Sequence, residues 1–139
     1  MKSLVLNIDE INLIVEKLKS KIIKYDNNVI VILRGDLASG KTTFVKNFVK
    51  YLKLDDLVTS PTFSLQAIYS DKIYHYDVYN KTLEEFISLG LLEEFEKEGI
   101  HFVEWGDRKL EELLKSYGYN VMLLEINKYD DKRQYILNE

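Results

Sequence analysis

The sequence predicts an α/β fold in which a mixed β-sheet is flanked by helices, and three consecutive segments predict it. Residues Val29–Leu33 form an apolar, β-branched run of the length of a buried strand. The next loop, Gly35–Thr42, fits the pattern G-x-x-x-x-G-K-[ST] at every fixed position. Residues 42–52 then place their apolar side chains on one face of a helix. Strand, glycine loop and helix in this order are typical of P-loop NTPases, so we predict a single domain of that kind over residues 1–139.

The residue types of this loop suit phosphate binding. Gly35 and Gly40 let the backbone take positive φ and approach a ligand closely. Backbone N–H groups and the positive end of the helix then form an anion site. Lys41 supplies a charge for the β- and γ-phosphates, and Thr42 a hydroxyl ligand for Mg²⁺. The predicted nucleotide-binding residues are Gly35, Asp36, Leu37, Ala38, Ser39, Gly40, Lys41, Thr42 and Thr43.

The other elements follow from hydrophobic spacing and boundary residues. Asn7 and Glu10 match a capping box that opens a helix, and Thr82 and Glu85 match a second one. Gly90 ends the second helix. Strands are expected over residues 3–7, 29–33, 63–69, 72–79, 100–105, 119–128 and 132–137. Helices are expected from 7 to about 24, from 42 to about 54, and over 82–89, 91–97 and 107–117.

Composition narrows the classes of function. The chain of 139 residues has no cysteine and only two histidines, which excludes a disulfide framework, a thiolate nucleophile and a cysteine-based zinc site. The net charge is −4, and the basic residues are scattered, so we do not expect tight direct binding of nucleic acid. We find no signal peptide and no apolar run of membrane-spanning length. A cytoplasmic protein without membrane contact is therefore expected.

Two carboxylates are the candidates for completing the P-loop site. Glu104 ends the apolar strand 100–105, where the acid of a Walker B motif stands, although an ordinary glutamate at the sheet edge is an equally good interpretation. Asp77 lies in an otherwise aromatic and aliphatic strand, where a carboxylate is costly unless it is paired or faces a site. We predict Lys41, Asp77 and Glu104 as catalytic residues, and Thr42, Asp77 and Glu104 as Mg²⁺ ligands.

Other side chains have both a structural and a functional interpretation. The segment Thr59–Phe63, around the only proline, is either a plain turn or a loop that senses the γ-phosphate. For Trp105 packing is the default, and for His75 a neutral, hydrogen-bonded side chain is favoured over a proton shuttle. Asn127–Asp130 matches the N-K-x-D pattern of GTPases, but no D-x-x-G switch precedes it, so we interpret it as a hairpin turn.

Several segments in this order and spacing together resemble the TsaE (YjeE) family, over roughly residues 3–127. The combination is specific, whereas each short motif alone is not. The segments are the P-loop Gly35–Thr43, Ser60-Pro-Thr-Phe63, Tyr74-His-Tyr-Asp-Val-Tyr79, Glu84-Glu-Phe-Ile-Ser-Leu-Gly90 and Val103-Glu-Trp105.

The resemblance implies an ATPase of bacterial tRNA threonylcarbamoyladenosine biosynthesis that uses ATP and Mg²⁺. It implies two partner proteins, TsaB and TsaD, which transfer the threonylcarbamoyl group, so that tRNA is met only through the complex. Lys41 and Thr42 match the phosphate and metal positions of the family, and Asp77 and Glu104 match its acids. Trp105 matches the tryptophan beside the second acid.

Three positions depart from the family pattern. Ala38 stands where the loop usually has glycine, which tightens the φ/ψ demands on the loop. Asn80 stands where arginine is common, which removes a cationic contact, and Gly106 replaces a common proline, which favours a more mobile loop. Of the three arginines, Arg34, Arg108 and Arg133, none is identifiable as a finger.

Slow hydrolysis by the chain alone, stimulated by its partners, is therefore expected. The alternatives are a small P-loop kinase and a non-catalytic module that binds ATP to change its affinity for partners. A kinase of this kind usually closes an arginine-bearing lid, and the sequence has no arginine cluster.

Overall fold

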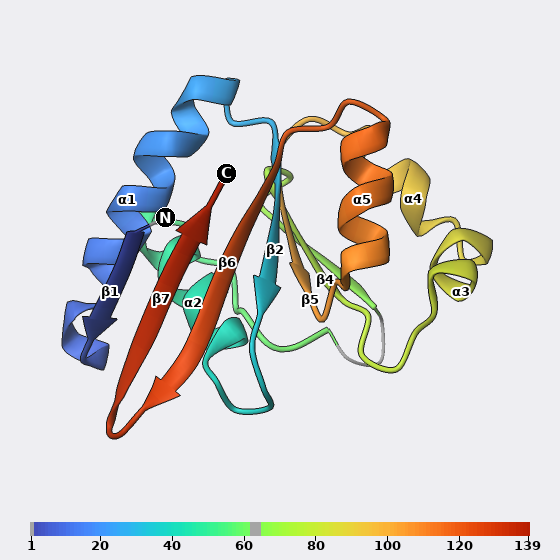
Figure 1. Cartoon of the computed structure of the whole chain (residues 1–139). Helices are drawn as coiled ribbons and strands as arrows, with labels where there is room; N and C mark the ends of the chain where they lie inside the picture. Colours follow the sequence, from blue (N-terminus) through green and yellow to red (C-terminus); the bar gives the residue numbers. More distant parts are fainter. Residues whose placement is uncertain (1, 62–64) are drawn as a thin grey trace.

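The computed structural model describes residues 2–61 and 65–139, and its centre is one seven-stranded sheet in the order β1-β7-β6-β2-β5-β4-β3 (Figure 1). The four inner strands β6, β2, β5 and β4 run parallel, and the three outer pairings are antiparallel. The strands are β1 Lys2–Leu6, β2 Val29–Arg34, β3 Gln66–Tyr69, β4 Ile73–Asp77, β5 Ile100–Glu104, β6 Val121–Tyr129 and β7 Lys132–Asn138. The predicted mixed sheet is confirmed.

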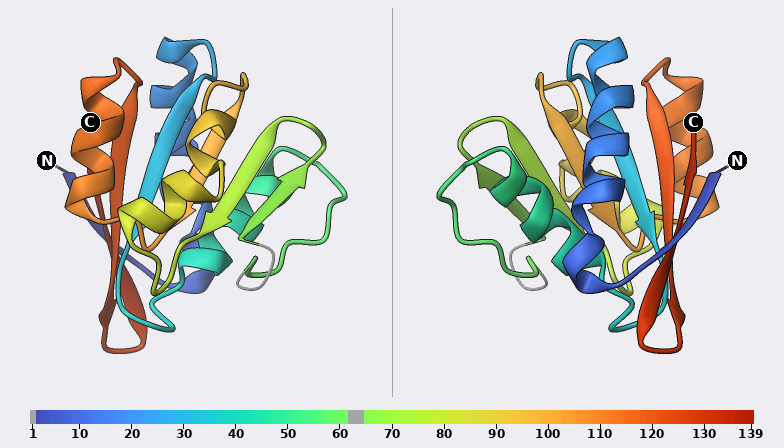
Figure 2. Two further views of the ribbon diagram at one scale, coloured as in Figure 1. Left: turned by 90° about the vertical axis from the view of Figure 1, so that its right-hand side faces the viewer. Right: turned by 90° about the vertical axis from the view of Figure 1, so that its left-hand side faces the viewer.

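Helices cover both faces of this sheet (Figure 2). Helices α1 and α2 share one apolar cluster with the sheet, whereas α3, α4 and α5 share the cluster on the opposite face. The helices are α1 Asn12–Ile22, α2 Lys41–Tyr51, α3 Leu83–Ser88, α4 Leu91–Glu94 and α5 Arg108–Ser116, with short 3₁₀ segments η1 Ile8–Glu10 and η2 Ile23–Tyr25.

The residues of β2 show why a continuous apolar run suits the centre of the sheet. Val29, Val31 and Leu33 point into the cluster under α1 and α2, whereas Ile30 and Ile32 point into the other. Successive side chains of a strand face opposite sides, so both faces of a covered strand must be apolar. This strand is therefore anchored from both sides, and its carboxyl end holds the loop that follows it.

Most predicted boundaries agree with the structure, and the differences have local causes. The capping box of Asn7 is present, because the Asn7 N–H donates to Glu10 Oε1 at 2.9 Å. However, it opens the 3₁₀ turn η1, so the single helix predicted from 7 to about 24 is η1, α1 and η2 in succession. The expected strand start at Phe63 lies outside the described residues, and β3 begins at Gln66.

Both predicted hairpins form. Ser70 and Asp71, between β3 and β4, have φ of 52° and 55°, the left-handed pair that matches strand twist in two-residue turns. The second hairpin joins β6 to β7, and its turn includes Asp130. Asn127 lies within β6 and its side-chain amide faces Gln134, at 3.4 Å. The N-K-x-D pattern is thus part of a hairpin, as predicted.

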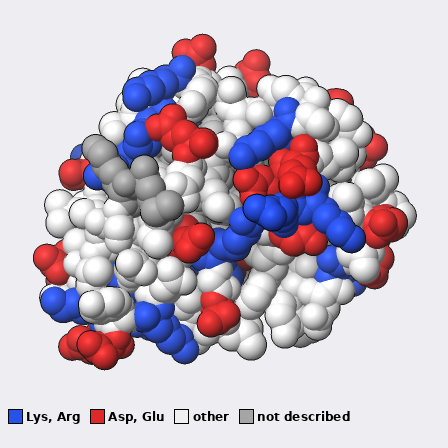
Figure 3. Space-filling model, viewed as in Figure 1, with Lys and Arg blue, Asp and Glu red and all other residues white. Residues whose placement is uncertain are grey.

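The face of the molecule in Figure 3 carries charges of both signs. On the face in Figure 3, Lys and Arg side chains of the described residues are interspersed with Asp and Glu, so no continuous basic surface lies there. Among the described residues, no helix combines the length and the apolar composition needed to cross a bilayer.

Candidate functional site

The site begins at the loop between β2 and α2, whose backbone has special requirements. Gly40, the residue before α2, has φ of 112°, as predicted for a glycine there. Gly35 is not among the glycines at positive φ, which corrects that part of the prediction. Glycine is required for another reason, since a Cβ at Gly35 would lie 2.3 Å from the carbonyl oxygen of Ile126 and 2.5 Å from Ser39 Oγ.

The departure at Ala38 has a structural consequence. Ala38 has φ of 59°, in the left-handed region where a side chain is disfavoured by roughly 1 kcal/mol relative to glycine. This agrees with the expected tightening of the loop. Asn80, the second departure, has the same φ of 59°, and asparagine tolerates this conformation better than most residues. Gly106, the third, is buried, and its carbonyl accepts a hydrogen bond from Arg34 Nε at 3.2 Å.

Ser39 indicates that the loop is shaped for an anion. Its side chain is 1% exposed, and among the described residues its Oγ has no hydrogen-bond partner. A buried hydroxyl without a partner is costly in a folded protein. Ser39 lies two residues before the start of α2, at the amino end of a helix, where backbone N–H groups lack partners within the helix and favour negative charge. The loop therefore fits a phosphate group.

Lys41 is held at the mouth of the loop by three neighbours. Its Nζ donates to the carbonyl oxygens of Gly35 at 2.6 Å and Asp36 at 3.0 Å, and it lies 3.9 Å from the centre of the Trp105 ring. Burial lowers the pKa of Lys41, and the negative charges of Glu104, Asp77 and Asp36 oppose that shift. Lys41 thus combines burial with surrounding acids, as a group that meets phosphate does.

Trp105 therefore does more than pack. Its ring contacts Lys41 on one side and forms an edge contact with Tyr79, at 4.8 Å between centroids. Its backbone has φ of 68°, which is unusual for a bulky residue and is found more often at functional sites than elsewhere. The expected packing of Trp105 is confirmed, since it is partly buried against the second apolar cluster, and in addition it lines the same cavity as the P-loop.

The two predicted acids lie side by side beside Thr42. Glu104 and Asp77 end the neighbouring strands β5 and β4 and are paired in register. The hydroxyl of Thr42 donates to Glu104 Oε2 at 2.8 Å, and both carboxylates are nearly fully buried. Three hard oxygen donors thus face one cavity of about 560 Å³ at the carboxyl ends of parallel strands, where ligands bind in open α/β sheets.

No group of three or more acidic or histidine side chains that would hold a metal alone occurs within residues 2–61 and 65–139.

A buried hydrogen-bond chain leads away from Glu104. Its Oε2 lies 2.5 Å from His75 Nε2, and His75 Nδ1 lies 2.9 Å from the hydroxyl of Tyr69. Burial, and to a smaller extent the charge of Glu104, raises the pKa of Tyr69 to about 12, so its hydroxyl keeps its proton. With a carboxylate as acceptor, Nε2 carries the hydrogen and Nδ1 accepts from Tyr69. The expected hydrogen-bonded histidine is confirmed, and its acidic partner was not foreseen.

The loop Thr59–Phe63 reaches the site through its described residues. Ser60 Oγ donates to Asp77 Oδ2 at 3.0 Å, and the carbonyl of Thr59 lies 3.4 Å from the Tyr69 hydroxyl. Thr62 and Phe63 lie outside the described residues. Both acids are thus linked to this loop, which agrees with a sensing role and does not test it.

The three arginines differ in position. Arg34 pairs with Glu111 at 2.9 Å, and the side chain of Arg108 is 86% exposed on α5. Arg133 of β7 lines the P-loop cavity, and its Nε donates to the carbonyl of Ser39 at 2.9 Å. Sequence reasoning did not select it, because 94 positions separate the two residues and only the strand order brings them together.

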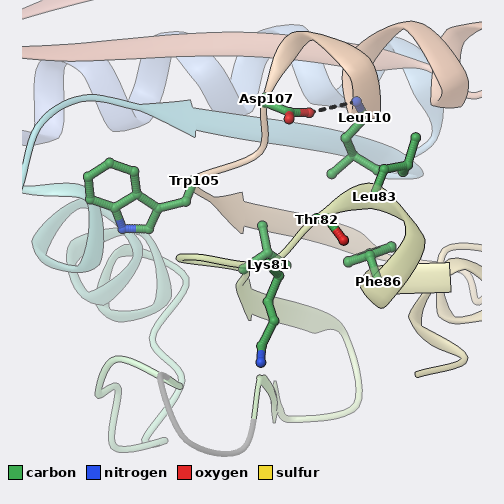
Figure 4. Close-up of a pocket in the computed structure, with 8 residues that line it drawn as sticks. Lys81, Thr82, Leu83, Phe86, Trp105, Asp107 and Leu110 are labelled. Carbon is green, nitrogen blue, oxygen red and sulfur yellow. Dashed lines mark hydrogen bonds between the residues drawn. The ribbon is translucent and has the colours of Figure 1, made fainter. Parts of the chain in front are cut away.

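A much smaller pocket adjoins the site beyond Trp105 (Figure 4). Lys81, Thr82 and Phe86 line one side of it, and Asp107, whose carboxylate accepts from the Leu110 N–H, lies near the other. Its volume of about 20 Å³ is enough for a water molecule but not for a metabolite.

Comparisons with known proteins identify the family of this chain. A family model described as "Threonylcarbamoyl adenosine biosynthesis protein TsaE" matches residues 7–135. The chain is similar to the "tRNA threonylcarbamoyladenosine biosynthesis protein TsaE" of Treponema pallidum, with 42% identity over 87 residues, which are 60% of this chain and 64% of that protein. The protein of the same name from Bacillus subtilis is 37% identical over 108 residues, which are 76% of this chain and 66% of that protein. The chain thus spans slightly less than two thirds of these relatives.

The fold is also found in a solved structure. The crystal structure of YdiB from Bacillus subtilis superposes with a TM-score of 0.66 at 27% sequence identity. The match covers 99% of this chain and 86% of that one. The likeness therefore includes the edge strands β1 and β7 as well as the P-loop core.

Proposed function

Since this chain belongs to the TsaE family, we propose that it binds and hydrolyses ATP with Mg²⁺ in support of tRNA threonylcarbamoyladenosine biosynthesis. The observation that carries the proposal is the hydrogen bond from Thr42 to Glu104, with Asp77 beside it. It joins the metal-binding hydroxyl of a P-loop to an acid at a strand end, as nucleotide hydrolysis requires. TsaB and TsaD are the partners we propose, with tRNA reached only through them.

The residues fit a magnesium ion and a triphosphate. Thr42 would hold Mg²⁺, with Glu104 or Asp77 as a ligand either directly or through water. The ion, when bound, would neutralise charge on the β- and γ-phosphates. The orphaned hydroxyl of Ser39 would meet a phosphate oxygen, and Lys41 would turn its third N–H toward the same group.

The attacking water would be positioned by the acidic side chains of this chain. One of Glu104 and Asp77 would orient the attacking water, and the fixed donor of His75 holds Glu104 in one orientation.

Arg34 is paired and Arg108 points to solvent, so neither is placed to stabilise the developing charge. Arg133 lines the P-loop cavity, but its Nε and Nη1 donate to the carbonyl oxygens of Ser39 and Lys132, so we assign it to holding the loop and not to the role of a finger. Since an arginine finger is worth on the order of 10³–10⁵ in rate, slow turnover alone and faster turnover with the partners follow.

A non-catalytic switch is the second candidate, and the link from Ser60 to Asp77 is the observation that favours it. A nucleotide that displaced Asp77 would also move this loop, which changes the surface offered to a partner. Such a module would dock in an ATP-dependent way even after Glu104→Ala and Asp77→Ala. An ATPase-driven cycle would lose its turnover in both variants.

The test is ADP production by Lys41→Ala, with and without TsaB and TsaD. Lys46→Ala is the matched control, because Lys46 is an exposed lysine on the same helix. We expect Lys41→Ala to abolish turnover and modified tRNA, and Lys46→Ala to leave both within about twofold. Retained turnover in Lys41→Ala would remove the P-loop from the mechanism. A rate unchanged by the partners would remove the coupling.

A further inference from the structure

Three buried side chains form a diagonal row across strands β3, β4 and β5. The register places Ala67 opposite His75, so Tyr69, two residues further along β3, lies on the same face at a diagonal position. Phe102 of β5 is also opposite His75, and Glu104 is the diagonal neighbour on that strand. The side chains of Tyr69, His75 and Glu104 are 4%, 0% and 3% exposed. The hydrogen bonds along this row are therefore shielded from water.

The hydroxyl of Tyr69 has one hydrogen and two neighbouring acceptors. It lies 2.9 Å from His75 Nδ1 and 3.4 Å from the carbonyl oxygen of Thr59. The first distance is that of an ordinary hydrogen bond and the second is longer than usual, so the hydrogen is directed to Nδ1. The carboxylate of Glu104, 2.5 Å from Nε2, requires the ring hydrogen at that nitrogen, which leaves Nδ1 as an acceptor. Tyr69 thus holds the end of the ring that faces away from the acid.

Glu104 receives its hydrogen bonds on one of its two oxygens. His75 Nε2 and the hydroxyl of Thr42, the latter at 2.8 Å, both donate to Oε2. From the residues that the structure describes, no hydrogen bond reaches Oε1, and Glu104 lines the cavity of the P-loop. With Oε2 occupied by two donors, Oε1 is the oxygen that can accept from a water molecule in this cavity. The orientation of the His75 ring therefore decides how this carboxylate is used.

We propose that Tyr69 is a positioning residue for ATP hydrolysis, because its hydroxyl keeps the His75 ring on Oε2 and leaves Oε1 of Glu104 for a water of the reaction, metal-bound or attacking. The inference rests on the proposed function, since it needs a hydrolytic reaction at this acid. Without the hydroxyl, the buried Nδ1 would have no donor, and a buried acceptor without a partner is costly. The ring would then turn to regain a partner, and Glu104 would lose its fixed donor.

The second tyrosine–histidine pair of the fold provides a matched control. The Tyr76 hydroxyl lies 2.7 Å from His101 Nδ1, but Nε2 of this ring donates to the carbonyl of Lys97 and not to an acid. Tyr69→Phe and Tyr76→Phe each remove one hydroxyl from a buried histidine and keep the aromatic ring. A purely structural role predicts the same result for both variants. Positioning of Glu104 predicts a loss of rate in Tyr69→Phe alone.

The first measurements are ADP production in the presence of TsaB and TsaD, and chemical denaturation, for both variants and the unmodified chain. Tyr69 acts one contact beyond His75, so we expect its replacement by Phe to lower kcat about three- to tenfold, with KM for ATP within about twofold. Tyr76→Phe should keep kcat within about twofold. Both denaturation midpoints should fall by similar amounts, since each variant loses one buried hydrogen bond.

The orientation of the ring is measured separately by nuclear magnetic resonance, without nucleotide. The chain has two histidines, so a sample labelled with ¹⁵N-histidine contains only two imidazole rings to distinguish. In Tyr69→Phe, the Nε2 hydrogen of His75 should exchange with water roughly tenfold faster, because the ring is no longer held at its other end. The Nε2 hydrogen of His101 should be unaffected there and should be the faster one in Tyr76→Phe.

The other outcomes overturn distinct statements. An unchanged kcat in Tyr69→Phe, equal losses of kcat in the two variants, or an unchanged exchange rate at His75 would remove Tyr69 from the positioning of Glu104. A raised KM with unchanged kcat would do the same, because it would place the effect of Tyr69 on nucleotide binding. If the unmodified chain made no ADP with its partners, the proposed function would fail, and this inference would fail with it.

Discussion

Two buried tyrosine–histidine pairs on neighbouring strands have different roles, one in the candidate site and one in the interior of the fold. His75 of β4 and His101 of β5 are 0% and 1% exposed. Each places its Nδ1 against a buried tyrosine hydroxyl, at 2.9 Å from Tyr69 and 2.7 Å from Tyr76. The difference is the acceptor of Nε2, which is the carboxylate of Glu104 for one ring. For the other ring it is the backbone carbonyl of Lys97, at 2.8 Å.

The surroundings of the two rings also differ, because one ring is packed among aromatic side chains and the other adjoins the candidate site. His101 is stacked on Tyr74, with ring centroids 4.4 Å apart and planes at 8°, and it contacts Phe95. Its hydrogen bonds end inside the fold, so its role is to satisfy and pack the interior. The bonds of His75 end at Glu104, which also accepts from Thr42. An oxygen acceptor at Nε2 fixes the tautomer in both cases, and only the identity of that acceptor makes one histidine part of the candidate site.

The largest expected effect is on the rate of ATP hydrolysis, and it compares a glutamate near His75 with a glutamate near His101. Glu104→Gln removes the charge beside Thr42, whereas Glu94→Gln removes a charge near His101 that is paired with Lys97 at 2.8 Å. ADP production should fall on the order of 10²-fold or more in Glu104→Gln and stay within about twofold in Glu94→Gln. ATP affinity should change little in either. Equal rates in the two variants would show that the charge of Glu104 has no particular role in hydrolysis.

The second prediction exchanges the histidines themselves. His75→Ala leaves Glu104 without its fixed donor, so kcat should fall about 10- to 100-fold with little change in KM. His75→Gln should restore part of the rate, because its amide can donate to the same oxygen. His101→Ala should leave kcat within about twofold while the free energy of unfolding falls by about 2–4 kcal/mol.

Rates and chemical denaturation of all three variants, at a temperature where each is folded, distinguish these roles. Two outcomes would erase the distinction: a His101→Ala variant that loses as much kcat as His75→Ala, or a His75→Gln variant no faster than His75→Ala.

Local features of this molecule were predictable from sequence because their causes are local. The strand of apolar residues in β2, the positive φ of Gly40 and the place of Glu104 at the end of β5 each follow from the residues at those positions. Tyr69 and His75 are only six positions apart, yet their contact needs the hairpin register that pairs Ala67 with His75. Hydrophobic spacing predicts that a hairpin exists and leaves the side-chain partners undetermined.

Features that depend on strand order could not be predicted from the sequence. Arg133 meets Ser39 because β7 lies two strands from β2, on the side away from the acids, and a single sequence does not specify which strands are neighbours. The contact of Trp105 with Lys41 was not predicted for another reason. Its left-handed backbone turns the ring onto Lys41, whereas the alternation of β5 predicts only a side chain at the end of a strand.

The smallest expected effect is on the pH dependence of folding stability, and it concerns His101 alone. Burial lowers the pKa of His101, although its bond to the Lys97 carbonyl and the nearby charge of Glu94 partly oppose this. The folded state therefore binds this proton less readily than the unfolded chain, whose histidine titrates near pH 6.5. The contribution of neutral His101 to the free energy of unfolding is complete above that pH. It is lost as the pH falls below it, by at most about 1.4 kcal/mol per pH unit.

Denaturant unfolding of the unmodified chain and of His101→Gln between pH 7.5 and 5 measures this contribution. His101→Gln keeps a donor for the Lys97 carbonyl and removes the titrating ring, so its free energy of unfolding should fall less steeply over this range. If both chains lost stability with the same slope, the acid sensitivity would come from other groups. His101 would then differ from His75 only in packing, and the comparison would rest on the acceptor of Nε2 alone.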